Sequence, residues 1–166
     1  MLKYFHVEGA DSSVGSVDAA DVQPFPVEVK TGATVTISAT LSLTATVPAG
    51  AKVALNIVKE GVVDLPIPCL EIEGLHVGSC EYEADYLLDK FSDFLCPAHV
   101  PEGQACATPL NPGTYGGDPP VTVTIPEIPD LIAGFLASGT YYADATIKYA
   151  DGSQMTCLYV RIEVVG

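Results

Sequence analysis

The sequence lacks tryptophan, has only 7 lysine and arginine residues and contains no long uninterrupted apolar run. So few basic side chains exclude a nucleic-acid partner, because phosphate binding needs a basic footprint. Without an apolar run of about 20 residues, neither a membrane-spanning helix nor a signal peptide is predicted. We therefore expect a mature secreted or lysosomal chain whose first methionine was added for expression.

Enzyme and metal-site motifs are missing as well. The chain has no G-x-S-x-G, no H-E-x-x-H, no phosphate-binding Gly-Lys loop and no calcium loop. It has no C-x-x-C, and His6, His76 and His99 do not have the spacing of zinc ligands. We therefore expect no catalysis, no metal and no cofactor.

What is present is apolar and acidic sequence. Hydrophobic residues make up 48% of the chain, and 21 acidic residues give a formal charge of −14. This composition predicts a folded domain, and the length favours a single one over residues 1–166. The negative charge opposes contact with anionic lipid at neutral pH, so transient contact with a membrane surface is expected to be favoured at acidic pH.

Four of the five cysteines form two close pairs around the only clear helical pattern, at about residues 82–95. Cys69 is near Cys80, and Cys96 is near Cys106, so each pair can close a short loop. In the chain-entropy model a loop of this size stabilises the fold by about 3 kcal/mol. Clustered cysteines indicate an oxidising compartment.

The clearest periodicity runs from Thr34 to Val47, where apolar residues alternate strictly with threonine and serine. A period of two predicts a strand, or two strands joined by a bend, with one buried and one wet face. Further strands are expected over residues 3–7, 25–30, 53–57, 121–125, 140–149 and 154–165, with the last two joined by a turn at Asp151-Gly152. The predicted fold class is all-β: a two-sheet antiparallel β-cup or immunoglobulin-like sandwich with one inserted short helix and a hydrophobic cavity.

Two apolar, proline-marked segments lie where connections are expected, at about residues 61–68 and 126–136. Together with the helix they are predicted to ring the entrance of the cavity. The candidate lipid-binding residues are Val62, Val63, Leu65, Leu87, Phe91, Phe94, Leu131, Ile132, Phe135 and Leu136. The alternative is that these segments fold inward as ordinary core, which would leave an immunoglobulin-like interaction or signalling module.

Short motifs around the cysteines also carry a family resemblance. They are Ile67-Pro68-Cys69, Gly78-Ser79-Cys80, Cys96-Pro97, Gly113-Thr114-Tyr115, Pro129-Asp130-Leu131 and Ser138-Gly139-Thr140-Tyr141, with Cys157 in the last strand. In this order they resemble the MD-2-related lipid-recognition (ML) family, and within it the ganglioside-activator branch. The resemblance covers about two-thirds of the chain, from Lys52 to the end.

The resemblance implies a β-cup that takes up a glycolipid, phospholipid or fatty acid and carries it or presents it to a hydrolase. It implies disulfides from Cys69 to Cys80 and from Cys96 to Cys106. A hydrolase partner and a homodimer stay open as further partners.

Three departures from the family pattern matter. The N-terminal partner of Cys157 is missing, with Gly9 near its place, so we expect Cys157 to be a free thiol or an intermolecular link. A further cysteine pair of the family is absent, and Tyr86 and Thr108 are at the nearest positions in this sequence. The family's tryptophan in the rim loop is also absent, and the nearest large residue is Leu65.

Overall fold

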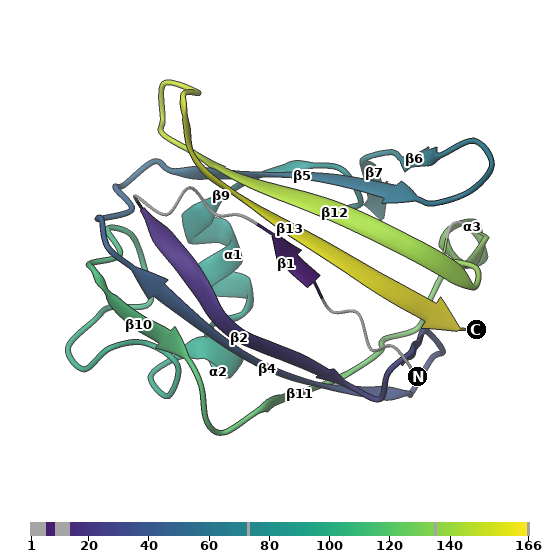
Figure 1. Cartoon of the computed structure of the whole chain (residues 1–166), viewed down its shortest axis with the longest axis horizontal. Helices are drawn as coiled ribbons and strands as arrows, with labels where there is room; N and C mark the ends of the chain where they lie inside the picture. The colour runs from purple at the N-terminus through teal and green to yellow at the C-terminus, as the bar shows by residue number, and fades with distance from the viewer. Residues whose placement is uncertain (1–5, 9–13, 73, 135, 166) are drawn as a thin grey trace.

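Two curled β-sheets face each other in the computed structural model, with a helical segment between them at one end (Figure 1). The structure describes residues 6–8, 14–72, 74–134 and 136–165. This arrangement confirms the predicted all-β, two-sheet class.

The larger sheet has seven strands. Its main order is β1 (His6–Glu8), β13 (Gln154–Val165), β12 (Gly139–Lys148), β5 (Lys52–Lys59) and β6 (Leu65–Ile67). The short strand β3 (Val27–Glu28) pairs in parallel with β13, and β9 (Glu81–Glu83) pairs with β5. As predicted, β12 and β13 form a hairpin, and Gly152 adopts the left-handed φ of +87° that its turn requires.

The smaller sheet has four strands around β4 (Thr34–Leu43). One edge of β4 pairs with β2 (Gly15–Gln23); the other pairs first with β11 (Val121–Thr124) and then with β10 (Gly113–Gly116). The alternating pattern predicted a strand to Val47, but the ladder ends at Leu43 and Val47 makes an isolated bridge with Leu110.

The remaining elements are short. A hairpin of β7 (Leu70–Ile72) and β8 (Leu75–Val77) precedes α1 (Ala84–Lys90) and α2 (Ser92–Leu95), and α3 (Asp130–Ala133) precedes β12. The predicted helix over residues 82–95 is therefore divided, since its first residues form β9 and Phe91 separates α1 from α2.

Two strand predictions differ from the structure. No strand was predicted over residues 15–23, yet these residues form β2, because pairing with β4 stabilises a strand whose glycine, serine and aspartate residues have low strand propensity. The strand expected over residues 25–30 is reduced to Val27–Glu28, because Pro24 and Pro26 have no amide hydrogen to donate to a ladder.

The sheets are fastened together at two places. One buried cluster joins β4 and β13 to the start of α1 and comprises Val14, Leu43, Val47, Ala51, Ala84 and Met155. A second joins β2, β3 and β4, through Val22, Val27 and Val35. Among the described residues no large side chain is fully buried, so the packing between the layers is thin.

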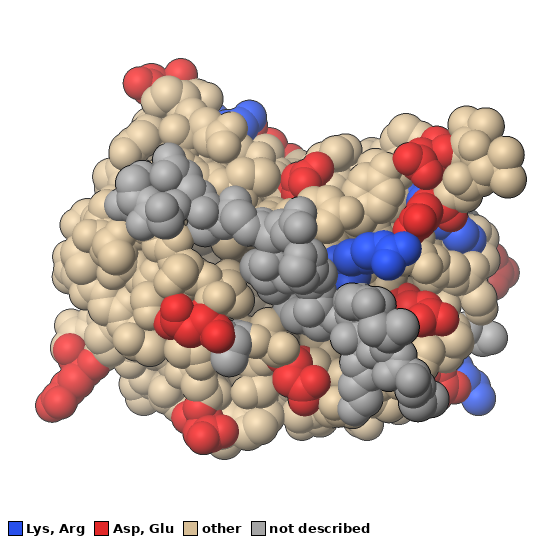
Figure 2. Space-filling model, viewed as in Figure 1, with Lys and Arg blue, Asp and Glu red and all other residues tan. Residues whose placement is uncertain are grey.

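Acidic side chains are scattered over the face shown in Figure 2, and basic ones are few there. No described helix is long and apolar enough to cross a membrane.

Candidate functional site

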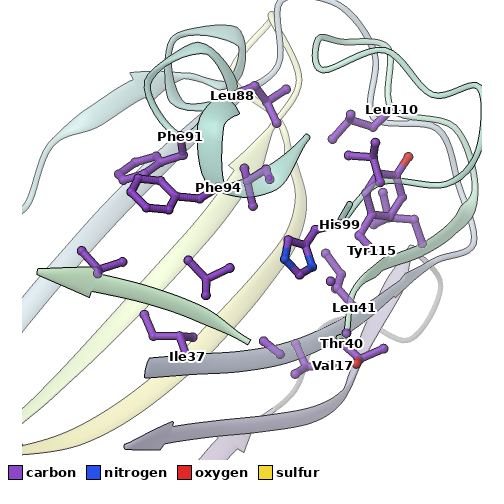
Figure 3. Close-up of a pocket in the computed structure, with 18 residues that line it drawn as sticks. Val17, Ile37, Thr40, Leu41, Leu88, Phe91, Phe94, His99, Leu110 and Tyr115 are labelled. Atoms are coloured by element: carbon purple, nitrogen blue, oxygen red, sulfur yellow. The ribbon is translucent and has the colours of Figure 1, made fainter. Parts of the chain in front are cut away.

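A cavity of about 490 Å³ lies between the smaller sheet and the segment that contains α1, α2 and the loop after them (Figure 3). This volume is within the usual range of ligand pockets, about 300–1,000 Å³. Most of the lining side chains are apolar, and none is a lysine, arginine, aspartate or glutamate. The lining residues are Val17, Ile37, Ala39, Thr40, Leu41, Leu43, Leu88, Phe91, Phe94, Leu95, His99, Val100, Leu110, Tyr115, Gly116, Gly117, Val121 and Val123.

The sheet wall follows from the alternating sequence of β4. Ile37, Ala39, Leu41 and Leu43 are each two residues apart, so they project from the same face of the strand. Neighbouring strands contribute apolar side chains to the same wall from β2 and β11. The predicted apolar face of β4 therefore forms the sheet wall of the cavity.

The opposite wall comes from the helices. Leu88, Phe91 and Leu95 follow one another at spacings of three and four residues, which places them on one side of the helical segment, and Phe94 joins them. The helical segment is interrupted at Phe91, between α1 and α2, but its apolar side faces the sheet along its length (Figure 3).

The solvent exposure of the lining residues varies strongly, and the most exposed large side chains mark the mouth of the cavity. Ile37, Phe91 and Phe94 are 39%, 48% and 40% exposed, whereas Leu43 is 6% exposed. We call Ile37, Phe91 and Phe94 the mouth residues. Large apolar side chains are exposed there because they border an open apolar space instead of packing into a filled core.

Polar side chains of the lining are few, and one has its hydrogen bonds within the chain. The Tyr115 hydroxyl donates to the Asn111 carbonyl at 2.7 Å, and Gln104 Oε1 lies 3.2 Å from it. Burial raises the pKa of Tyr115 above its ordinary value, so this hydroxyl keeps its proton and remains a donor.

His99 differs from Tyr115. It is only 7% exposed, and its Nδ1 is buried without a hydrogen-bond partner in the described part of the chain. Figure 3 shows the imidazole between the helical segment and β4, in the middle of the lining residues. An unpartnered buried polar group costs about 1–3 kcal/mol, so this position is unfavourable for the protein taken alone.

The loop that carries His99 is held from both sides. Its Cys96 is bonded to Cys106, with 6.0 Å between the Cα atoms. The His99 amide donates to the Leu95 carbonyl at 2.8 Å, and the Gly116 amide donates to the His99 carbonyl at 2.8 Å. The disulfide and these two bonds fix His99 against α2 and β10.

A carboxylate links α1 to the same loop. Asp85 accepts hydrogen bonds from the Thr108 amide at 2.7 Å and from the Thr108 hydroxyl at 2.8 Å. These bonds, from the amide first and the hydroxyl second, lower the pKa of Asp85 below its ordinary value of 3.8. A polar contact therefore joins α1 to the loop.

The predicted residues fall into three groups. Phe91 and Phe94 line the cavity, whereas Leu87 does not and Leu88 takes its place. Both leucines are about one helical turn before Phe91, so the spacing alone did not choose between them.

The second group lies away from this cavity. Val62, Val63 and Leu65 are exposed at and beside the turn between β5 and β6, with Val62 and Val63 108% and 84% exposed. Figure 1 shows this turn near α3, at the end of the molecule away from α1. These three residues do not line the cavity, and their contact with lipid stays a prediction.

The third group lies near α3. Leu131 and Ile132 belong to α3, but their side chains are outside the described part of the structure, as is the whole of Phe135. Leu136 is half-buried and does not line the cavity. Sequence reasoning missed His99, Leu110 and Tyr115, because only tertiary contacts bring these loop and strand residues to the helices.

The cysteines are arranged as the resemblance implied. Cys69 is bonded to Cys80, which closes the β7–β8 hairpin, and Cys157 is unpaired. His76 lies close to the sulfurs of Cys69 and Cys80, but both sulfurs are used in the disulfide and are not available as metal ligands.

Comparison with known proteins gives little further information. No protein-family model matches the chain, and no curated protein matches it. Among solved structures it is similar to a Niemann-Pick type C2 protein from the Japanese carpenter ant, at 12% sequence identity over 98% of this chain and 99% of that chain, with a TM-score of 0.46.

Proposed function

We propose that this protein is a non-catalytic lipid-binding and lipid-transfer protein. The observation that supports the proposal is the apolar cavity of about 490 Å³, with large apolar side chains exposed at its mouth. The alternative of an immunoglobulin-like interaction module requires a filled core, and the cavity argues against it.

The size of the cavity suits one acyl chain. A methylene group occupies roughly the volume of a water molecule, about 30 Å³, so the cavity has room for about 16 of them. Each methylene removed from water contributes about 0.8 kcal/mol. The free energy gained by burying a single acyl chain is therefore large enough for binding, because the free lipid is almost insoluble in water.

The ligand classes follow from this space and from the resemblance to the ML family. A fatty acid enters whole, and a phospholipid or glycolipid inserts a chain and leaves its head group outside. The protein then carries the lipid, or presents it to a hydrolase, in a secreted or lysosomal setting where its two disulfides persist. The exposed Val62 and Val63 are proposed to make the transient contact with the membrane.

Filling the cavity tests this function. Ala39 projects from β4 into the cavity, so Ala39→Trp places an indole where the acyl chain is proposed to lie. We expect at least a tenfold loss of affinity for a fluorescent fatty acid, measured by titration, with little change in the thermal midpoint. Ala49→Trp, at an exposed turn outside the cavity, is the matched control. Equal affinity of both variants and the wild type for the fluorescent fatty acid would contradict the proposal.

A further inference from the structure

We propose that His99 binds the carboxyl group of a single-chain fatty acid and so sets both the ligand class and its orientation in the cavity. This inference rests on the proposed function and goes beyond it, because the apolar walls alone do not distinguish one acyl lipid from another.

The imidazole of His99 is isolated. His99 is over nine-tenths buried and lines the cavity, and its Nδ1 has no hydrogen-bond partner among the described residues. Its backbone amide and carbonyl, by contrast, are both bonded within the chain. The backbone is therefore fixed while the ring has polar capacity that the described protein does not use, and a ligand in the cavity is placed to use it.

Charge favours the same assignment. No lysine, arginine, aspartate or glutamate among the described residues lines the cavity, and the Tyr115 hydroxyl already donates to the Asn111 carbonyl. A carboxylate buried alone among apolar side chains is strongly disfavoured. With His99 beside it, the acid's proton can pass to the ring nitrogen, which gives an imidazolium–carboxylate pair of zero net charge joined by a charge-assisted hydrogen bond.

The position of His99 orients the ligand. The His99 carbonyl accepts from the Gly116 amide of β10, and β10 pairs with the C-terminal half of β4, so the backbone of His99 lies beside the sheet wall while its ring lies between the helical segment and β4 (Figure 3). The mouth residues are more exposed than His99, which places His99 within the enclosed part of the cavity. The carboxyl group therefore lies at His99, and the acyl chain extends toward Phe91 and Phe94.

The test compares palmitic acid with its methyl ester, which keeps the chain and removes the acidic proton. Each probe displaces the uncharged dye phenylnaphthylamine from the wild type, from His99→Leu and from the control His76→Leu, an exposed histidine outside the cavity. We expect the wild type and the control to prefer the acid about tenfold, which is about 1.4 kcal/mol. In His99→Leu this preference is expected to disappear through weaker binding of the acid, with ester affinity within about twofold of the wild type.

A second readout does not depend on a variant. Titration of the ¹⁵N-labelled wild type with the acid is expected to move the imidazole nitrogen resonances of His99 to imidazolium positions, whereas the ester, which has no acidic proton, is expected to leave the ring in its unliganded protonation state. An acid-to-ester ratio that is the same in the wild type and in His99→Leu, or unmoved His99 resonances, would overturn the role of His99 while lipid binding stands. Failure of both probes and the dye to bind the wild type would overturn the proposed function together with this inference.

Discussion

Asp85 and Thr108 show how single side chains secure the cavity wall. The two hydrogen bonds from Thr108 stabilise the charged form of Asp85 and connect α1 to the loop that carries His99. Because they favour the carboxylate, the pKa of Asp85 is lower in the folded state than in the unfolded chain. A proton that binds Asp85 therefore weakens the folded state.

The pH dependence of stability follows from this sign. The contribution of Asp85 is fully present above its ordinary value of 3.8 and is lost as pH falls through the lower folded pKa. We expect Asp85→Asn to be less stable than the wild type at pH 7 and the difference to shrink as pH falls below 3.8, measured by urea unfolding across pH. Asp89→Asn, an exposed carboxylate of the same helix, is the control. A stability difference for Asp85→Asn that is constant over this range would contradict the assignment.

At the scale of elements, the two disulfides make different predictions. Cys96–Cys106 closes the loop that bears His99 and Val100, whereas Cys69–Cys80 closes a hairpin that does not line the cavity. The double variant Cys96→Ser/Cys106→Ser is expected to lose about 2–4 kcal/mol of unfolding free energy and to release bound fatty acid faster.

The other pair provides the comparison. Cys69→Ser/Cys80→Ser is expected to lose a similar amount of stability and to keep the wild-type release rate, measured by stopped-flow transfer to vesicles. Equal acceleration of release in both double variants would show that the Cys96–Cys106 loop has no particular role in the cavity.

The turn between β5 and β6 makes a separate prediction about membrane contact. Val62 and Val63 are the two most exposed large hydrophobic side chains in the described part of the chain. We expect Val62→Ser/Val63→Ser to slow lipid uptake from vesicles several-fold without changing the affinity for fatty acid in solution. Val165→Ser, at an exposed position on β13, is the control. Unchanged uptake by the double variant would remove this turn from the mechanism.

Elements differ in how far the sequence could predict them. The strict alternation of β4 and the turn at Gly152 are local signals, and both led to correct strands. The strand β2 was missed, because its register depends on pairing with β4 and not on its own residues. Likewise the helical pattern led to Phe91 and Phe94, whereas His99 reaches the cavity only through contacts with α2 and β10.

At the scale of the whole molecule, the chain combines an apolar interior with a surface of net charge −14. Buried clusters hold the sheets together at two places, and the helical segment covers the cavity beside them. The apolar cavity therefore opens beside secondary structure that is held together elsewhere, and we expect a ligand to enter and leave it without unfolding of the sheets.

Native mass spectrometry of the purified protein, followed by organic extraction, tests this arrangement most directly. The account predicts a protein that carries one single-chain lipid, or that gains the mass of one fatty acid after incubation with it, and that loses this mass on extraction. A protein that shows only its own mass before and after incubation, and that leaves fluorescent fatty acids unbound, would contradict it.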